Sequence, residues 1–207
     1  MIWVFLLLFL SNTYATEWNC TGASNTGTFQ RSTSCTISGT TTTNGGGVVV
    51  TNTLEIVGTI EDMNNLIVIT APSKQRHFYI NGVNDKLVLR YLKLIGGEAG
   101  DTNNNGASVY IEAGGTLQLY TSILANNNNN NNNGILFADG DRTNINAVTI
   151  QLHQTIITNN LNCALVIYSA TFSMVNSTLS RNGALYSHGG GMHIESSNVT
   201  ILRSVIS

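Results

Sequence analysis

Three stretches of the chain decide its fold: LQLYTSILANN at residues 117–127, IQLHQTIITNN at 150–160 and FSMVNSTLSRN at 172–182. Each stretch places apolar side chains at its first, third and eighth positions and an asparagine at its eleventh. Apolar residues at i and i+2 lie on one face of a β-strand. The recurrence of this pattern indicates stacked copies of one structural unit.

Further copies of the pattern begin at Leu87 and at Val199, so that successive copies start 30, 33, 22 and 27 residues apart (87 to 117, 150, 172 and 199). This spacing is typical of a coil whose turns carry loops of different lengths. A second alternating apolar pair precedes each copy: Phe78/Ile80, Val109/Ile111, Ile135/Phe137, Leu165/Ile167 and Met192/Ile194.

One such unit cannot bury its apolar row alone, but stacked coils bury it continuously. We therefore expect an all-β chain that forms a right-handed parallel β-helix of about five to six coils. The asparagine at the eleventh position should form a hydrogen-bonded ladder, because Asn tolerates a left-handed backbone and pairs with Asn in the next coil. A β-sandwich would lack this constant register, and a helical solenoid would need apolar stripes of period 3.6, which are missing.

Residues 1–15 are predicted to be a signal peptide that is cleaved after Ala15. The run IWVFLLLFL at 2–10 is too short to span a bilayer, which takes about 20 residues, but suits the apolar region of an export signal. The segment lacks Lys or Arg before this run, and the alternative is a buried N-terminal strand. Export places the protein outside the cell or at its surface. No later segment is apolar enough to be expected to span a membrane.

Residues 16–75 fit the repeat less well and are interpreted as an N-terminal cap with the first coils, while 76–207 hold the regular coils. The eight asparagines at 126–133 are expected to bulge out as a flexible loop. The last copy stops at Ser207, directly after its inward Ile206. Because solenoids need polar caps, we expect further coils in the native product or end-to-end self-association here.

The three cysteines suit an exported protein, in which disulfides persist. Cys20 and Cys35 are predicted to form a disulfide, and Cys163 to be a buried thiol within an apolar strand. Sequons at Asn19, Asn176 and Asn198 are candidate glycosylation sites in a eukaryote, although a chain rich in Asn and Thr also contains sequons by chance.

The charge pattern excludes some classes of partner. The formal net charge is −2 and only 10% of residues are charged. Lys and Arg form no basic stripe, so we expect neither nucleic-acid binding nor a polybasic membrane-surface patch.

Short motifs carry a resemblance to a known group. GGMHI at 190–194 resembles a GGA[IL] signature, and LANN at 124–127 and LSRN at 179–182 resemble FxxN with Leu in place of Phe. Over roughly residues 75–207 the chain resembles the right-handed β-helix repeat proteins of the pectin-lyase-like superfold. It is most similar to polymorphic outer-membrane-protein-like repeats. The group includes secreted adhesins, passenger domains and polysaccharide-degrading enzymes.

A polysaccharide lyase of this fold needs acidic ligands for Ca²⁺ and a basic residue to abstract a proton. Asp139, Asp141 and Arg142 are the candidate catalytic residues, with Glu98 and Asp101 in an earlier loop. An ordinary Asp-Gly turn with solvated charges is the favoured alternative. A hydrolase needs two nearby carboxylates, and the chain has no adjacent Asp pair and only eleven carboxylates. No cofactor is expected, and Ca²⁺ only in a lyase.

Tyrosines at 79, 91, 110 and 120 lie between or beside inward positions and are candidate binding residues. Tyr79, Tyr91, Tyr110 and Tyr120 would offer sugars or proteins an apolar face with a polar tip. The equal alternative is aromatic stacking that merely stabilises the rod. The histidines at 77, 153, 188 and 193 are predicted to be solvated surface residues.

These observations favour a secreted, non-catalytic β-helix that binds polysaccharide or cell-surface glycans or other surface molecules, as an adhesin or wall-associated module. One alternative is a polysaccharide lyase or glycoside hydrolase of the same superfold. Another is a fragment of a longer β-helix surface protein.

Overall fold

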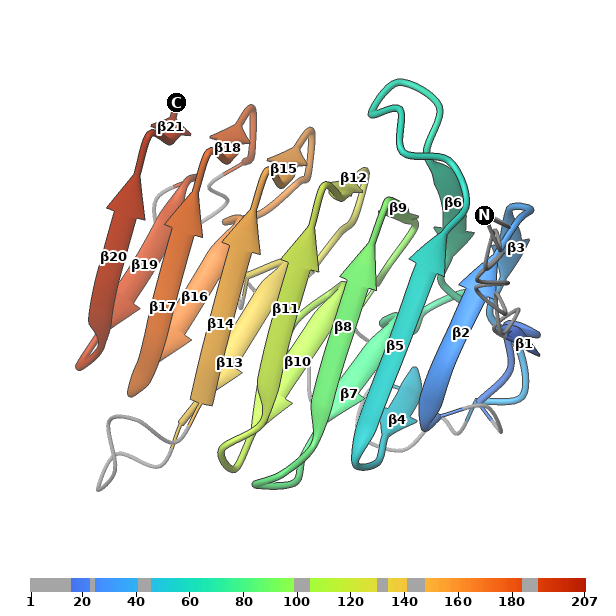
Figure 1. The fold of residues 1–207 in the computed structure, drawn as a ribbon. Coiled ribbons are helices and arrows are strands. Elements are labelled where there is room, and N and C mark those ends of the chain that lie inside the picture. The colour runs from blue at the N-terminus through green and yellow to red at the C-terminus, as the bar shows by residue number, and fades with distance from the viewer. Residues whose placement is uncertain are drawn as a thin grey trace, which may run out of the picture.

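A computed structural model describes residues 16–22, 25–40, 46–98, 105–129, 134–140, 148–183 and 190–207, so the predicted signal peptide lies outside the described residues. These residues contain strands and no helix, and hence no helix that is long and apolar enough to cross a bilayer. The strands form three parallel sheets that wind into a right-handed β-helix (Figure 1). The predicted fold is confirmed.

We name the sheets by their position in Figure 1. The front sheet contains β1 (Thr16–Glu17), β2 (Gly27–Arg31), β5 (Thr53–Gly58), β8 (Lys86–Arg90), β11 (Thr116–Tyr120), β14 (Val148–His153), β17 (Ala170–Val175) and β20 (Asn198–Leu202). The upper sheet contains β3 (Cys35–Thr36), β6 (Ile67–Thr70), β9 (Leu92–Ile95), β12 (Ile123–Ala125), β15 (Ile156–Thr158), β18 (Thr178–Ser180) and β21 (Val205–Ile206). The back sheet contains β4 (Val48–Val50), β7 (Phe78–Ile80), β10 (Val109–Glu112), β13 (Leu136–Asp139), β16 (Leu165–Tyr168) and β19 (Met192–Glu195).

The apolar positions of the repeat line the interior, as predicted. Leu117 and Leu119 of β11 pair with Ile150 and Leu152 of β14, and all four are buried. Each coil thus stacks the same inward positions on those of the next, so the core is one continuous column. Burial of apolar surface, at about 25 cal/mol per Å², is the main stabilising contribution.

The predicted inward pair Ile135/Phe137 is wrong for Phe137 only, because Ile135 is buried in the main core just before β13. Leu136 and Ala138 pair with the inward Val109 and Ile111, whereas Phe137 pairs with Tyr110 on the outer face. The segment ILFA is apolar throughout, so alternation alone cannot set its phase. Pairing with β10 and β16 on either side sets it instead.

The corner between the front and upper sheets is a repeated tight bend. It opens with a residue of positive φ in five consecutive coils: Tyr91, Thr121, Gln154, Asn176 and Arg203. A left-handed conformation costs a non-glycine residue about 1–2 kcal/mol, so packing of the coils must hold these bends. Hydroxyl groups help at the next residue, where the Thr155 amide donates to Ser177 Oγ (3.0 Å) and the Ser177 amide to Ser204 Oγ (3.1 Å).

The asparagine ladder forms as predicted. Asn127 Nδ2 donates to Asn160 Oδ1 (3.1 Å), and Asn160 Nδ2 donates to Asn182 Oδ1 (2.8 Å). The same oxygens accept the backbone amides of the preceding coil, so that Asn160 Oδ1 also binds the Asn127 amide (2.9 Å). Part of the asparagine run at 126–133 is therefore no bulging loop, because Asn127 and Asn129 are buried and hydrogen-bonded.

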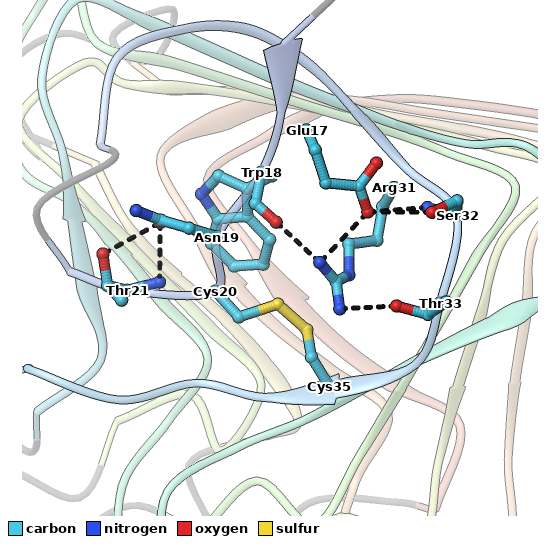
Figure 2. A network of polar contacts seen from close by, with 9 residues as sticks. All are labelled: Glu17, Trp18, Asn19, Cys20, Thr21, Arg31, Ser32, Thr33 and Cys35. Atoms are coloured by element: carbon cyan, nitrogen blue, oxygen red, sulfur yellow. Dashed lines mark hydrogen bonds and ion pairs between the residues drawn. A yellow bond between two sulfur atoms is a disulfide. The ribbon is translucent and has the colours of Figure 1, made fainter.

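The N-terminal residues belong to the stack more fully than expected. Strands β2, β3 and β4 pair with β5, β6 and β7, which extends the rod beyond five to six coils. Trp18 is completely buried at this end and its ring lies 6.0 Å from that of Phe78. Arg31 of β2 connects this strand to the segment at 17–18. Its guanidinium donates to the Trp18 carbonyl (2.8 Å) and to Glu17 (3.1 Å), beside the Cys20–Cys35 disulfide (Figure 2).

The last coil has the same strands but leaves its inward side chains exposed. Val199 and Ile201 of β20 pair with the buried Phe172 and Met174 of β17. Their exposed fractions are 46% and 38%, whereas those of Phe172 and Met174 are 1% and 0%.

Candidate binding surface

Two of the candidate tyrosines lie on the outer face of the back sheet but are buried there. Tyr79 and Tyr110 are in register on β7 and β10, and their rings stack with centroids 5.3 Å apart. Phe137 continues the column with an edge contact at 5.5 Å. The exposed fractions of Tyr79 and Tyr110 are only 7% and 5%. These aromatic side chains therefore form a small second apolar cluster outside the main core.

Arg76 lies over this column. Its Cζ atom is 5.6 Å from the Tyr79 ring centroid and 4.9 Å from that of Tyr110, which is cation–π distance. Arg76 is completely buried, and burial lowers its pKa to about 10 against the opposing influence of the two phenols and Glu112. The guanidinium is thus one of the groups that bury these two rings.

The phenols of Tyr79 and Tyr110 both donate hydrogen bonds to the Glu112 carboxylate. Burial, followed by this hydrogen bond to a carboxylate, raises the pKa of Tyr79 to about 12 and also raises the pKa of Tyr110. Both phenols are therefore neutral donors at physiological pH. Their polar tips are already engaged within the protein.

The other two tyrosines belong to the front sheet. Tyr120 points outward from β11, with Arg90 Cζ 4.0 Å from its ring centroid and the His153 ring 6.1 Å away. Arg90 also forms an ion pair with Glu55 (2.9 Å). Tyr91 is the left-handed corner residue after β8, and its amide donates to the Tyr120 carbonyl (3.1 Å). The structure therefore does not bring the four tyrosines together.

The outer face of the front sheet, called the front face below, carries rows of polar side chains along the rod. Each outward position of β11 repeats in β14 and β17 because the three strands pair in register. Gln118 Nε2 donates to Gln151 Oε1 (2.6 Å), which links two coils directly. The rows in β11, β14 and β17 are Thr116/Thr149/Thr171, Gln118/Gln151/Ser173 and Tyr120/His153/Val175.

These outward side chains are all partly exposed, and none of them is a carboxylate. Figure 1 shows β8, β11, β14 and β17 side by side at the front of the rod. Sequence reasoning identified Tyr120 on this face as a candidate binding residue and placed His153 at the surface. The period-2 alternation contained the signal for the rest, because residues flanking an inward leucine must point outward.

The candidate catalytic residues are placed only in part. Asp139 is exposed at the end of β13, while Asp141 and Arg142 lie outside the described residues. Asp139 is in register with Glu112 of β10, a carboxylate that sequence reasoning did not select. The register error at Ile135/Phe137 hid this pairing. Among the described residues no group of three or more His, Cys, Asp or Glu side chains is arranged to hold a metal ion.

The structure corrects the prediction for one histidine. His77 is completely buried rather than solvated, whereas His153 and His193 are partly exposed on β14 and β19. His188 lies outside the described residues. The error has a local cause, because His77 precedes β7 at a corner, where strand alternation does not indicate the side-chain direction.

The structure shows the bonding of the three cysteines and the exposure of the three sequon asparagines. A disulfide joins Cys20 and Cys35, and Cys163 is a free buried thiol whose pKa is raised by burial. The sequon residues at 19, 176 and 198 are all exposed, which leaves Asn19, Asn176 and Asn198 as candidate glycosylation sites. Asn19 Oδ1 accepts hydrogen bonds from the Thr21 amide (3.2 Å) and hydroxyl (2.9 Å).

No protein-family model, curated protein or solved structure matches the chain. The parallel β-helix is therefore assigned from this chain's own strand pairing. A function must likewise be inferred from its surface chemistry, since a fold alone does not specify one.

Proposed function

We propose that the protein is an extracellular, non-catalytic β-helix that binds glycans or other cell-surface molecules through its front face. The observation that carries this proposal is the set of polar rows in register on β11, β14 and β17. Parallel strands lie about 4.8 Å apart, so the Thr116/Thr149/Thr171 and Gln118/Gln151/Ser173 rows present hydroxyl and amide groups at a short, regular interval along the rod.

Hydroxyl and amide groups suit a ligand with many hydroxyls. Gln118 and Gln151 use one donor and one acceptor on each other, and each amide has further hydrogen-bonding capacity. Tyr120 contributes an aromatic edge and a phenol beside them. One face of its ring is taken by Arg90, so hydrogen bonding rather than stacking is the main proposed mode of binding.

A glycan array probed with the full purified chain, with and without Ca²⁺, tests this proposal. We expect binding that a Gln118→Ala/Gln151→Ala variant weakens about tenfold or more, as the loss of two hydrogen bonds of ~1 kcal/mol each would produce. The matched control is Thr158→Ala/Ser180→Ala on the outer side of the upper sheet, which should bind normally. Equal loss in both variants, or no binding to any glycan, would refute the proposal.

Export is part of this proposal. The predicted signal at 1–15 and the Cys20–Cys35 disulfide support it, because disulfides persist in oxidising compartments. Expression in the source cell should yield a product in the medium or at the surface whose first residue is Thr16. An intracellular product that retains Met1 would contradict it.

We further propose membership of the pectin-lyase-like superfold, nearest to polymorphic outer-membrane-protein-like repeats. The support is that Asn127 and Asn182 of the FxxN-like motifs are both members of the asparagine ladder. Gly190 and Gly191 of the GGA-like motif directly precede β19. A crystal structure whose coils superpose poorly on that superfold would reject the assignment.

A polysaccharide lyase or hydrolase is the second candidate, and one observation favours it. Asp139 and Glu112 are carboxylates in register on neighbouring strands, where two acids could act on one bond. Turnover would appear as new reducing ends, or as absorbance of unsaturated products for a lyase. It should be abolished by Asp139→Asn and by Glu112→Gln, and full activity in both variants would exclude this pair.

A further inference from the structure

The buried His77 ring lies within hydrogen-bonding distance of residues from three successive coils of the rod. Its Nε2 atom lies 3.2 Å from the Ile69 carbonyl of β6 and 2.9 Å from the Ile95 carbonyl of β9. Carbonyls only accept, so Nε2 carries the proton and Nδ1 accepts from the Ser108 hydroxyl (3.2 Å), just before β10. The ring thus bridges two strands of the upper sheet and the start of a back-sheet strand.

The site has little room to adapt. His77 is completely buried, and a Cβ atom added at Gly97 would lie 2.9 Å from its Nδ1. A second proton on the ring would force the Ser108 hydroxyl to reverse its role from donor to acceptor. The cation would also be buried, where an ionised group is costly without a counter-charge.

Among the described residues, the His77 ring forms hydrogen bonds with two carbonyls and a hydroxyl, and its chain neighbour Arg76 is a cation. Strands β6 and β9 contribute the carbonyls of Ile69 and Ile95, and β4 contributes the Val48 amide, which donates to the His77 carbonyl (2.8 Å). The nearest charge along the chain is the buried Arg76. Burial is the main influence and lowers the pKa of His77 to about 4, while the two carbonyls oppose the shift.

We propose that protonation of His77 opens the segment at 71–77 in acid and uncovers the stacked tyrosines of the back sheet. This segment joins β6 to β7 and carries both His77 and Arg76. Because Arg76 packs on the rings of Tyr79 and Tyr110, its displacement removes one of the groups that bury both. The device is a pH-dependent cover over an aromatic surface, and it is independent of the proposed glycan binding.

The sign of the effect follows from linkage. In the open state His77 is hydrated and titrates near its ordinary pKa of about 6.5. The open state therefore binds more protons than the closed state as the pH falls from 6.5 to 4. The equilibrium constant for opening is constant well above pH 6.5, is raised about 150-fold at pH 4, and approaches a limit of about 300-fold at lower pH.

Two measurements on the full chain test this proposal. The first is an NMR titration of the His77 ring, which should remain neutral down to about pH 4–5. The second is hydrogen exchange of the peptide spanning 71–80, corrected for the intrinsic rate. There the His77 and Phe78 amides, both bonded to the Ser108 carbonyl, should lose protection as the pH falls below 6.5. Hydroxyl-radical footprinting should show Tyr79 and Tyr110 becoming reactive over the same range.

A His77→Gln variant should retain closure at all pH values between 7 and 4, because its amide cannot gain a proton. The matched control is His153→Gln on the front face, which should open in acid like the unmodified chain. The proposal is overturned if His77 titrates at 6.5 or above, if Tyr79 and Tyr110 stay protected at pH 4, or if His77→Gln opens as the control does. If His77→Gln does not fold, the ring titration and footprinting of the unmodified chain decide.

Discussion

The two ends of the rod differ in how their large apolar side chains are covered. At the N-terminal end Trp18 lies fully buried, with the Arg31 network and the Cys20–Cys35 disulfide holding the segments around it (Figure 2). In the last coil, Val199 and Ile201 have the same register as buried residues of the coils before but remain over one-third exposed. An apolar residue in a solenoid therefore contributes fully only when coils cover it on both sides.

The largest expected effect comes from the row of inward side chains that contains both Leu119 and Ile201. Leu119→Ala in β11 should destabilise the protein by about 2–5 kcal/mol, because it leaves a cavity in a buried core. Ile201→Ala, in the same row of β20, should cost less than about 1 kcal/mol, since that side chain already contacts water. Chemical denaturation of both variants measures the difference. Equal costs would show that the last coil is covered in solution.

Removal of the Cys20–Cys35 disulfide measures how much it stabilises the N-terminal end of the rod. Cys20→Ser/Cys35→Ser should reduce the free energy of unfolding by about 3 kcal/mol, as expected for closure of a loop of this length (sequence separation 15). A Cys163→Ser variant is the control and should leave the response to reductant unchanged. If reductant has no effect on the thermal midpoint of the unmodified chain, the disulfide does not stabilise this end.

The asparagine ladder gives a smaller contrast of the same kind. Asn160 has an asparagine neighbour on either side, so Asn160→Ala removes the acceptor of the buried Asn127 side-chain amide and the donor to the partly buried Asn182 Oδ1, at a cost of about 1–3 kcal/mol. Asn182 accepts from Asn160 and donates to the Ile157 carbonyl (2.9 Å). Because Asn182 is less buried than Asn160, we expect Asn182→Ala to destabilise the protein less than Asn160→Ala does. The reverse order in urea titrations would contradict this account.

The smallest expected effect is on the front face. Arg90→Met removes a partly exposed cation–π contact and an ion pair, so the loss should be about 0.5–1 kcal/mol. Thermal unfolding at low and at 1 M salt should show the difference shrinking with salt. A loss above 2 kcal/mol would mean that this surface stabilises the rod as strongly as its interior does.

Repetition made much of the fold predictable. Leu117, Leu119 and Asn127 recur at fixed offsets, and the structure places them inward and in the ladder. The corners were not predictable, because Thr121 and Gln154 adopt a left-handed backbone without the glycine that usually signals it.

The surface was less predictable than the core. Alternation correctly places Tyr79 and Tyr110 on the outer face of their strands. Arg76, which precedes β7, packs on them and contributes to their burial. Alternation describes one strand at a time. The packing of Arg76 on the two tyrosines, and the proximity of Glu112 and Asp139 on neighbouring strands, are therefore visible only in the three-dimensional structure.

The corner between the front and upper sheets has a consequence for how this rod can change in length. Thr121–Ser122, Gln154–Thr155 and Asn176–Ser177 are each the whole link between two strands, whereas the other two corners vary in length from coil to coil. From β8 to β21 this short bend recurs in every coil, and it forms a spine along which these coils can be duplicated or deleted as modules. The other two edges are where foreign peptides can be grafted, for example between β7 and β8, without disturbing the spine.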